Sequence, residues 1–137
     1  RPFLVLFACV HNAGRSQLAA ALFNQRADPR RARALSAGTA PAARLHPVVA
    51  EVLREAGVAV DELRPRLLTA DLAQSADLLV TLGCGEACPV VPGLRREDWP
   101  LPDPKDQPID VVRALRAEID ARVEALLAAL PRRGPMV

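Results

Sequence analysis

Residues 9–16 of this chain read Cys-Val-His-Asn-Ala-Gly-Arg-Ser, and they lie between two apolar segments of different periodicity. The residues before them, 3–8, form a continuous apolar run whose β-branched and aromatic content is typical of a buried strand. The residues after them, 16–23, place Leu18 and Leu22 on one face of a helix. The stretch is therefore predicted to be a strand-to-helix turn, where successive backbone N–H groups and the helix N-terminus attract an anion.

Cys9 opens this turn and Arg15 closes it, with five residues between them. An oxyanion held by the backbone would meet the Cys9 sulfur below it and the planar Arg15 guanidinium beside it. The same positive field favours a Cys9 thiolate, to which the Ser16 hydroxyl can donate a hydrogen bond. A structural cysteine beside a solvated arginine is the alternative, but Gly14, Ser16 and the helix in register favour a binding loop. Asn12 is expected to brace that loop by bonding neighbouring backbone. The predicted oxyanion-binding residues are Val10, His11, Asn12, Ala13, Gly14, Arg15 and Ser16.

Segments with strand and helix periodicity alternate along the rest of the chain. Further strands are expected at 33–36, 77–82 and 96–99, and helices over 47–56, 69–75 and 108–130. This alternation predicts an α/β fold: a small doubly wound, three-layer α/β/α structure with a four-stranded parallel sheet and a phosphate-binding loop after the first strand. We expect a single domain over residues 1–137. Its ligand should lie beyond the carboxyl ends of the strands, which Cys9, Gly38 and Cys84 follow.

Cys84 and Cys88 lie in the long irregular segment 83–104, and their spacing leaves three interpretations open. Two idle surface thiols are one, and half of a zinc site is another. Zinc needs four ligands, and neither His11 nor His46 has a paired spacing with these cysteines, so no metal is expected. The third interpretation is redox exchange: if Cys9 bonds an oxyanion, Cys84 can attack Cys9, and Cys88 can take over the disulfide and carry it to the surface.

Asp103, which precedes Pro104, is the candidate general acid. Expulsion of hydroxide from an oxyanion requires a proton, and a carboxyl group desolvated beside a bound anion holds its proton more readily. Asp-Pro also favours turns, so a purely structural turn is the alternative. Asp98 and Asp106 are weaker candidates because neither precedes proline.

Cys9, five residues, Arg15 and then Ser16 resemble the phosphate-binding signature of low-molecular-weight protein tyrosine phosphatases. With the later cysteine pair and Asp103-Pro104, the chain resembles thioredoxin-coupled arsenate reductases built on the same fold. The resemblance implies that Cys9 attacks arsenate, that Asp103 is the acid, and that Cys84 and Cys88 form a disulfide cascade. It also implies thioredoxin as an external reductant, no bound cofactor, and phosphate or sulfate as competing oxyanions. Some relatives bind potassium through a carboxylate early in the first helix, where this chain has residues 19–21 as alanine, which argues against a potassium site.

Composition narrows the function further. A net charge of +2 gives no indication of nucleic-acid or membrane binding, and no apolar run approaches membrane-spanning length. Three cysteines are an odd number, which in a cytoplasmic protein points to catalysis or redox exchange more than to a disulfide scaffold. A cytoplasmic location is expected, and a monomer is the default expectation. The alternative function is a tyrosine phosphatase that uses Cys9, Arg15 and Asp103. The absence of tyrosine from the chain argues against that alternative.

Overall fold

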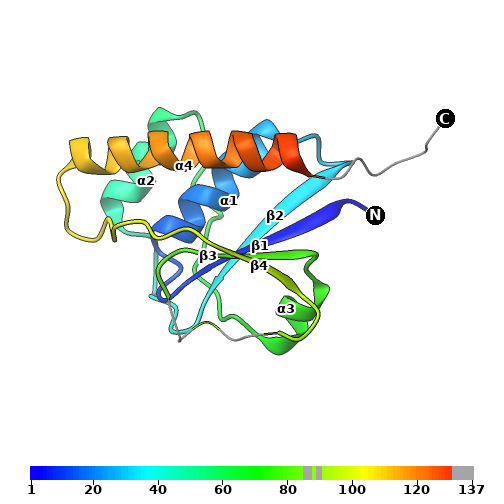
Figure 1. Ribbon diagram of the computed structural model, residues 1–137. Coiled ribbons are helices and arrows are strands. Elements are labelled where there is room, and N and C mark those ends of the chain that lie inside the picture. Colours follow the sequence, from blue (N-terminus) through cyan, green and yellow to red (C-terminus); the bar gives the residue numbers. More distant parts are fainter. Residues whose placement is uncertain (85–87, 89–90, 131–137) are drawn as a thin grey trace.

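Four parallel strands form a single sheet with β1 at its interior (Figure 1). The computed structural model describes residues 1–84, 88 and 91–130. The strands are β1 (Phe3–Cys9), β2 (Ala32–Gly38), β3 (Leu78–Thr81) and β4 (Arg95–Asp98), in the spatial order β2-β1-β3-β4. Every pairing is parallel, as expected from strands connected through helices. The predicted four-stranded parallel sheet is confirmed.

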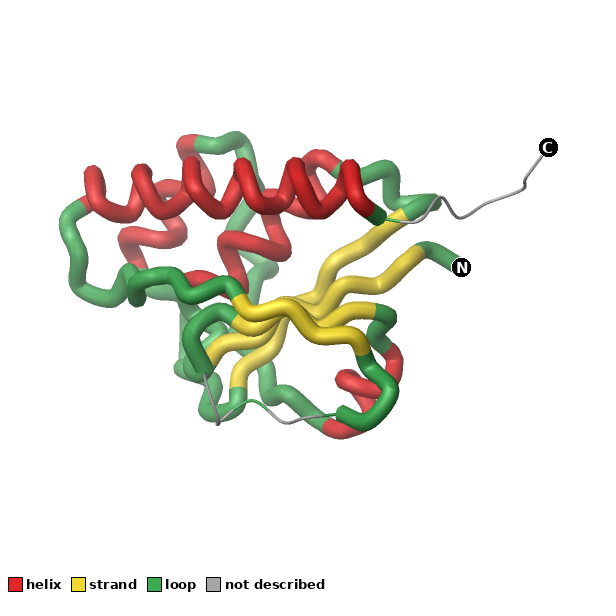
Figure 2. Tube along the Cα trace, in the orientation of Figure 1, coloured by secondary structure: helices red, strands yellow, loops and turns green. Residues whose placement is uncertain are grey.

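Helices cover both faces of this sheet, which confirms the predicted three-layer arrangement (Figures 1 and 2). α1 (Arg15–Arg26), α2 (Pro47–Glu55) and α4 (Ile109–Ala129) lie on one face, and the short α3 (Ala70–Ser75) lies on the other. None of the helices in the described ranges is long and apolar enough to cross a bilayer. α4 buries the apolar stripe expected from its sequence: Val112, Leu115, Ile119, Val123 and Leu126.

The helix ends follow local signals that the sequence contains. The Thr69 hydroxyl accepts a hydrogen bond from the Leu72 N–H at 3.1 Å, so Thr69 caps α3 as expected. α2 stops before Gly57, whose φ of +83° is a conformation that glycine adopts without steric cost. The ends therefore lie within a few residues of their predicted positions.

Side chains of β1 alternate between two separate apolar clusters, one on each face of the sheet. Phe7 and Cys9 belong to the cluster beneath α1, α2 and α4, whereas Leu6 and Ala8 belong to the cluster on the α3 side. Cys9 is aligned with Gly38 at the end of β2. The expectation that strand ends meet at one edge of the sheet is confirmed for these two residues, and this edge is where a ligand of such a sheet is expected.

Candidate active site

Four carbonyl groups of the loop between β1 and α1 point toward segment 39–46. The carbonyl oxygens of Cys9, Val10, His11 and Ala13 accept hydrogen bonds of 2.8–3.2 Å from the N–H groups of Thr39, Ala40, Ala42 and His46. In a trans peptide the N–H points opposite to the carbonyl, so the N–H groups that follow these four carbonyls point away from segment 39–46. The first N–H groups of α1 add to them, because they have no partner within the helix. The loop is therefore a cradle of N–H donors suited to an oxyanion.

The Cys9 sulfur is already held by two polar groups of this loop. It lies 2.9 Å from the Ser16 Oγ and accepts a hydrogen bond from the Asn12 N–H at 3.3 Å. The Asn12 Nδ2 donates to the Ser16 Oγ at 2.7 Å, so the Ser16 hydroxyl proton is free to point at the sulfur. The Asn12 N–H donates toward the sulfur, and the Ser16 hydroxyl is free to do the same, which leaves the sulfur held in place for nucleophilic attack.

Asn12 is the centre of the loop's bracing, as the sequence suggested. Its φ is +50°, a left-handed conformation that asparagine tolerates better than most residues, and the residue is fully buried. Its Oδ1 accepts from the Arg66 N–H at 3.0 Å and from the Gln17 Nε2 at 3.2 Å. Gln17 carries no motif signal and was missed by the sequence analysis.

Arg15 links the loop to the segment that contains the predicted acid. Its Nη1 donates to the Leu101 carbonyl oxygen at 2.8 Å, and its Nη2 lies 4.0 Å from the Asp103 Oδ2, the outer limit of an ion pair. The guanidinium also passes close to Gly83, where a Cβ would come within 3.0 Å of Arg15 Cζ and closer still to Nη1. Arg15 and Asp103, 88 positions apart in the chain, are therefore brought together.

This close approach gives a first prediction. Gly83→Ala should displace the Arg15 guanidinium, because a Cβ at position 83 occupies its place, and should weaken sulfate binding roughly tenfold. Gly93→Ala is the matched control: φ is +80° there and +84° at Gly83, but the added Cβ meets no atom within 4 Å. Titration calorimetry with sulfate should separate the two variants. Equal affinities would contradict the role given to Gly83.

Asp103 makes a turn contact and also faces Arg15, and its role as the general acid stays a prediction. Its Oδ1 accepts from the Lys105 N–H at 3.0 Å, which is a turn contact, while Oδ2 faces Arg15. Pro104 packs over the loop, since a Cβ on Gly14 would lie 2.8 Å from the Pro104 Cγ. The Asp-Pro turn thus places the Asp103 carboxylate at the rim of the cradle.

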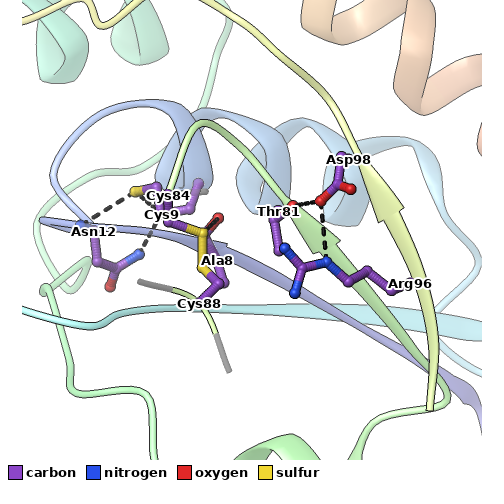
Figure 3. The surroundings of a disulfide bond; sticks show 9 residues. Ala8, Cys9, Asn12, Thr81, Cys84, Cys88, Arg96 and Asp98 are labelled. Carbon is purple, nitrogen blue, oxygen red and sulfur yellow. Dashed lines mark hydrogen bonds and ion pairs between the residues drawn. A yellow bond between two sulfur atoms is a disulfide. The ribbon is translucent and has the colours of Figure 1, made fainter. Parts of the chain in front are cut away.

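Asp98 is less suited to act as an acid. Its carboxylate accepts a short hydrogen bond from the Thr81 hydroxyl and a 3.1 Å bond from the Arg96 Nε (Figure 3). These contacts, with Thr81 the larger, hold the pKa of Asp98 below its usual range. A proton on Asp98 would therefore be lost too readily, which leaves Asp103 as the better candidate.

His46 is a second site residue that the sequence analysis did not assign. Its backbone N–H donates to the Ala13 carbonyl oxygen at 3.0 Å, and a Cβ on Gly14 would lie 3.3 Å from the His46 Cδ2. Burial lowers the pKa of His46, against the opposing attraction of Asp103. The imidazole therefore packs on the cradle in its neutral form near pH 7.

Cys84 and Cys88 form a disulfide whose Cα atoms are 5.5 Å apart, and Cys9 remains a free thiol. The expectation that this disulfide lies at the surface is wrong: the two residues are 6% and 2% exposed. They pack in the apolar cluster on the α3 side of the sheet, with Cys84 Sγ 3.8 Å from the Ala8 carbonyl oxygen. The Cys9 sulfur belongs to the opposite face and points toward Asn12 (Figure 3).

Metal-ligating side chains do not gather in the part of the chain that the structure describes. No group of three or more histidine, cysteine, aspartate or glutamate residues lies close enough there to hold an ion. The polar groups of the site instead surround a single thiol and a set of N–H donors. That combination suits covalent attack on an oxyanion.

Comparison with known proteins places the chain in a family. The family model of low molecular weight phosphotyrosine protein phosphatases matches residues 4–135. The structure of the thioredoxin-dependent arsenate reductase of Corynebacterium glutamicum is 39% identical, with a TM-score of 0.79; the match covers 93% of this chain and 61% of that protein, so this chain spans less than two thirds of its length. The arsenate reductase of Archaeoglobus fulgidus is 35% identical, with a TM-score of 0.76, over 90% of this chain and 98% of its own. A glutaredoxin arsenate reductase of Synechocystis is 30% identical over 90% of this chain and 95% of its own. This chain therefore belongs to the low-molecular-weight phosphotyrosine protein phosphatase family and, within it, to the arsenate reductases.

Proposed function

We propose that this protein reduces arsenate to arsenite through Cys9, Cys84 and Cys88. One observation carries the proposal: a free cysteine lies in an oxyanion cradle, while the other two cysteines of the chain are paired with each other. A reduction needs two electrons, and closing one disulfide supplies two. The cradle alone suits a phosphatase as well, so the cysteine pair is the feature that favours reduction.

The reaction begins with attack by the Cys9 thiolate on arsenic. A hydroxyl group of the arsenate leaves as water after Asp103 gives it a proton, and the loop N–H groups and Arg15 hold the remaining oxygens. Cys84 then attacks the Cys9 sulfur as a thiolate, and the electron pair of the sulfur–arsenic bond stays on arsenic, which leaves as arsenite. Cys88 attacks Cys84 in turn, so that Cys9 is released as a thiolate and the Cys84–Cys88 disulfide remains.

To bind arsenate with both arms of its guanidinium, Arg15 must give up its hydrogen bond to the Leu101 carbonyl oxygen. Its Nη1 bond to the Leu101 carbonyl is a neutral-acceptor contact, and a bound oxyanion offers a charged acceptor in a geometry that suits a guanidinium fork. Exchange of one for the other would free Arg15 from Leu101, which lies two residues before Asp103. We infer that oxyanion binding and placement of the acid are coupled in this way.

We propose thioredoxin as the reductant, acting on a cytoplasmic monomer. Among the relatives, the C. glutamicum protein is named as thioredoxin-dependent and the Synechocystis protein as a glutaredoxin enzyme. The burial of Cys84 and Cys88 supports a macromolecular reductant that docks and opens the loop, because a small thiol gains little binding energy to do so. Phosphate and sulfate, which share the shape of arsenate, are expected to compete for the cradle.

A turnover assay tests the proposal and separates it from the phosphatase alternative. Arsenate with thioredoxin, thioredoxin reductase and NADPH should give continuous NADPH oxidation and arsenite. A parallel reaction with glutaredoxin and glutathione should be slower, and hydrolysis of p-nitrophenyl phosphate slower still. Phosphate release without arsenate-dependent NADPH oxidation would overturn the proposal in favour of a phosphatase. Faster cycling with glutaredoxin would reject thioredoxin but keep the reductase.

A further inference from the structure

The imidazole of His46 lies at the rim of the cradle, beside the Asp103-Pro104 turn. A Cβ on Gly14 would lie 3.3 Å from the His46 Cδ2 and 2.8 Å from the Pro104 Cγ, so both rings flank the same glycine. The His46 N–H donates to the Ala13 carbonyl oxygen at 3.0 Å, and the N–H at the other end of that peptide group points into the cradle. A single peptide group therefore separates His46 from the place of the oxyanion.

Charged groups of the loop and of the turn act on this imidazole: Asp103, Asp106, Lys105 and His11. The two carboxylates favour a positive imidazole, whereas the lysine and the other histidine oppose it. Burial has the largest influence and lowers the pKa of His46. His46 is also the N-cap residue of α2, and the positive end of the helix dipole acts in the same direction. With these groups alone the imidazole is neutral near pH 7.

A doubly charged oxyanion in the cradle would change this balance, because a nearby negative charge favours the imidazolium. The ring is free to respond, since neither of its nitrogens bonds to the part of the chain that the structure describes. A positive His46 would also offset the Asp103 carboxylate, which otherwise repels the anion from this rim. Arg15 offsets it only in part, since its Nη2 is 4.0 Å from the Asp103 Oδ2.

We propose that His46 is a specificity-determining residue that binds a proton together with a doubly charged oxyanion and so favours the dianionic forms of arsenate and its analogues. The proton comes from water, and no bond of the oxyanion is broken. The proposal rests on the proposed function, because it concerns the same cradle. Its test uses sulfate, which is doubly charged across the neutral range and undergoes no reaction, so the result does not depend on reductase activity.

Proton NMR can measure the charge on His46 directly, because the chain contains only two histidines. The carbon-bound imidazole protons are followed from pH 5 to 9 in protein with the Cys84–Cys88 disulfide closed, with and without saturating sulfate. His46→Gln assigns the two sets of signals. We expect sulfate to raise the titration midpoint of His46 by about one pH unit, the lower end of what an adjacent opposite charge produces.

The same shift requires that sulfate affinity depend on pH. A group whose pKa rises on binding strengthens binding at low pH, and this gain is lost as the pH rises through the pKa of the complex. Titration calorimetry should therefore show an affinity gain from pH 8 to pH 5 that is about five- to tenfold larger in the wild type than in His46→Gln. His46→Asn, which places a preferred N-cap residue at the start of α2, should behave like His46→Gln and exclude a folding defect.

His11→Gln is the matched control for the titration. His11 is the other histidine of the chain, and its side chain is exposed. This variant should keep the sulfate-induced shift of the His46 midpoint and the pH dependence of sulfate affinity. Loss of both in His11→Gln would assign the proton to His11 and overturn the proposal.

Three further outcomes are decisive. An unchanged His46 midpoint at saturating sulfate would overturn the proposal and leave the reductase function standing. Wild-type pH dependence in both His46 variants would overturn it as well. Failure of sulfate to bind at any pH would refute the cradle itself, and with it both this proposal and the proposed function. A shifted His46 midpoint in a protein that does not reduce arsenate would support the proposal and reject only the reductase.

Discussion

Replacement of Cys9 by serine is expected to abolish arsenate reduction, with turnover reduced at least ~1,000-fold, and to leave the fold intact. The hydroxyl is a far weaker nucleophile near neutral pH than the cysteine sulfur that Ser16 and the Asn12 N–H hold in the loop. Serine is only slightly smaller than cysteine, and it can accept the same hydrogen bonds at this buried position. The measurement is arsenite produced per chain in the thioredoxin-coupled assay.

Binding must be separated from chemistry in this variant. Sulfate should still bind Cys9→Ser with an affinity within a few-fold of the wild type, because the N–H donors and Arg15 are unchanged. An unchanged thermal midpoint would confirm that the fold is intact. Wild-type turnover by Cys9→Ser would eliminate Cys9 as the nucleophile, and with it the whole relay.

The fold could be predicted from sequence because its signals are local. The continuous apolar run of β1 and the stripe of α4 each lie within one element and need no knowledge of distant residues. The same holds for Cys9, Arg15 and Ser16, which are brought together by one strand-to-helix turn. A short motif at a strand end is the kind of site that a sequence shows best.

Contacts from irregular segments could not be predicted in this way. The Arg64 and Arg66 backbone reaches the loop across about fifty residues, and neither has a periodic pattern that signals it. His46 reaches Gly14 because α2 begins there, which depends on the packing of the whole helix. The burial of the Cys84–Cys88 disulfide likewise follows from the apolar cluster on the α3 side, to which separate parts of the chain contribute.

The order in which Cys84 and Cys88 react can be determined from the arsenite that each variant releases and from the disulfide that it contains at the end. Without any reductant, fully reduced wild-type protein should release one arsenite per chain and end with a Cys84–Cys88 disulfide. Cys88→Ser should also release one arsenite but end with a Cys9–Cys84 disulfide, because nothing then attacks Cys84. Cys84→Ser should release none, since no thiol is placed to free arsenic from Cys9. Rapid-quench arsenite assays and peptide mass mapping measure both quantities.

The structure gives a physical reason to expect a large difference between these variants under continuous cycling. With the Cys84–Cys88 disulfide formed, Cys84 packs on the α3 side of the sheet, whereas the Cys9 sulfur belongs to the opposite face. Disulfide bonding tolerates little misplacement, so Cys84 must leave the apolar cluster to reach Cys9 and return to it to pair with Cys88. Cys88→Ser removes the second position, and its Cys9–Cys84 bond would occupy the cradle itself, so thioredoxin-driven turnover should fall at least tenfold below the wild type. Sustained cycling by Cys88→Ser would show that Cys88 is not the resolving thiol, and one arsenite released by Cys84→Ser would show that Cys88 reaches Cys9 directly.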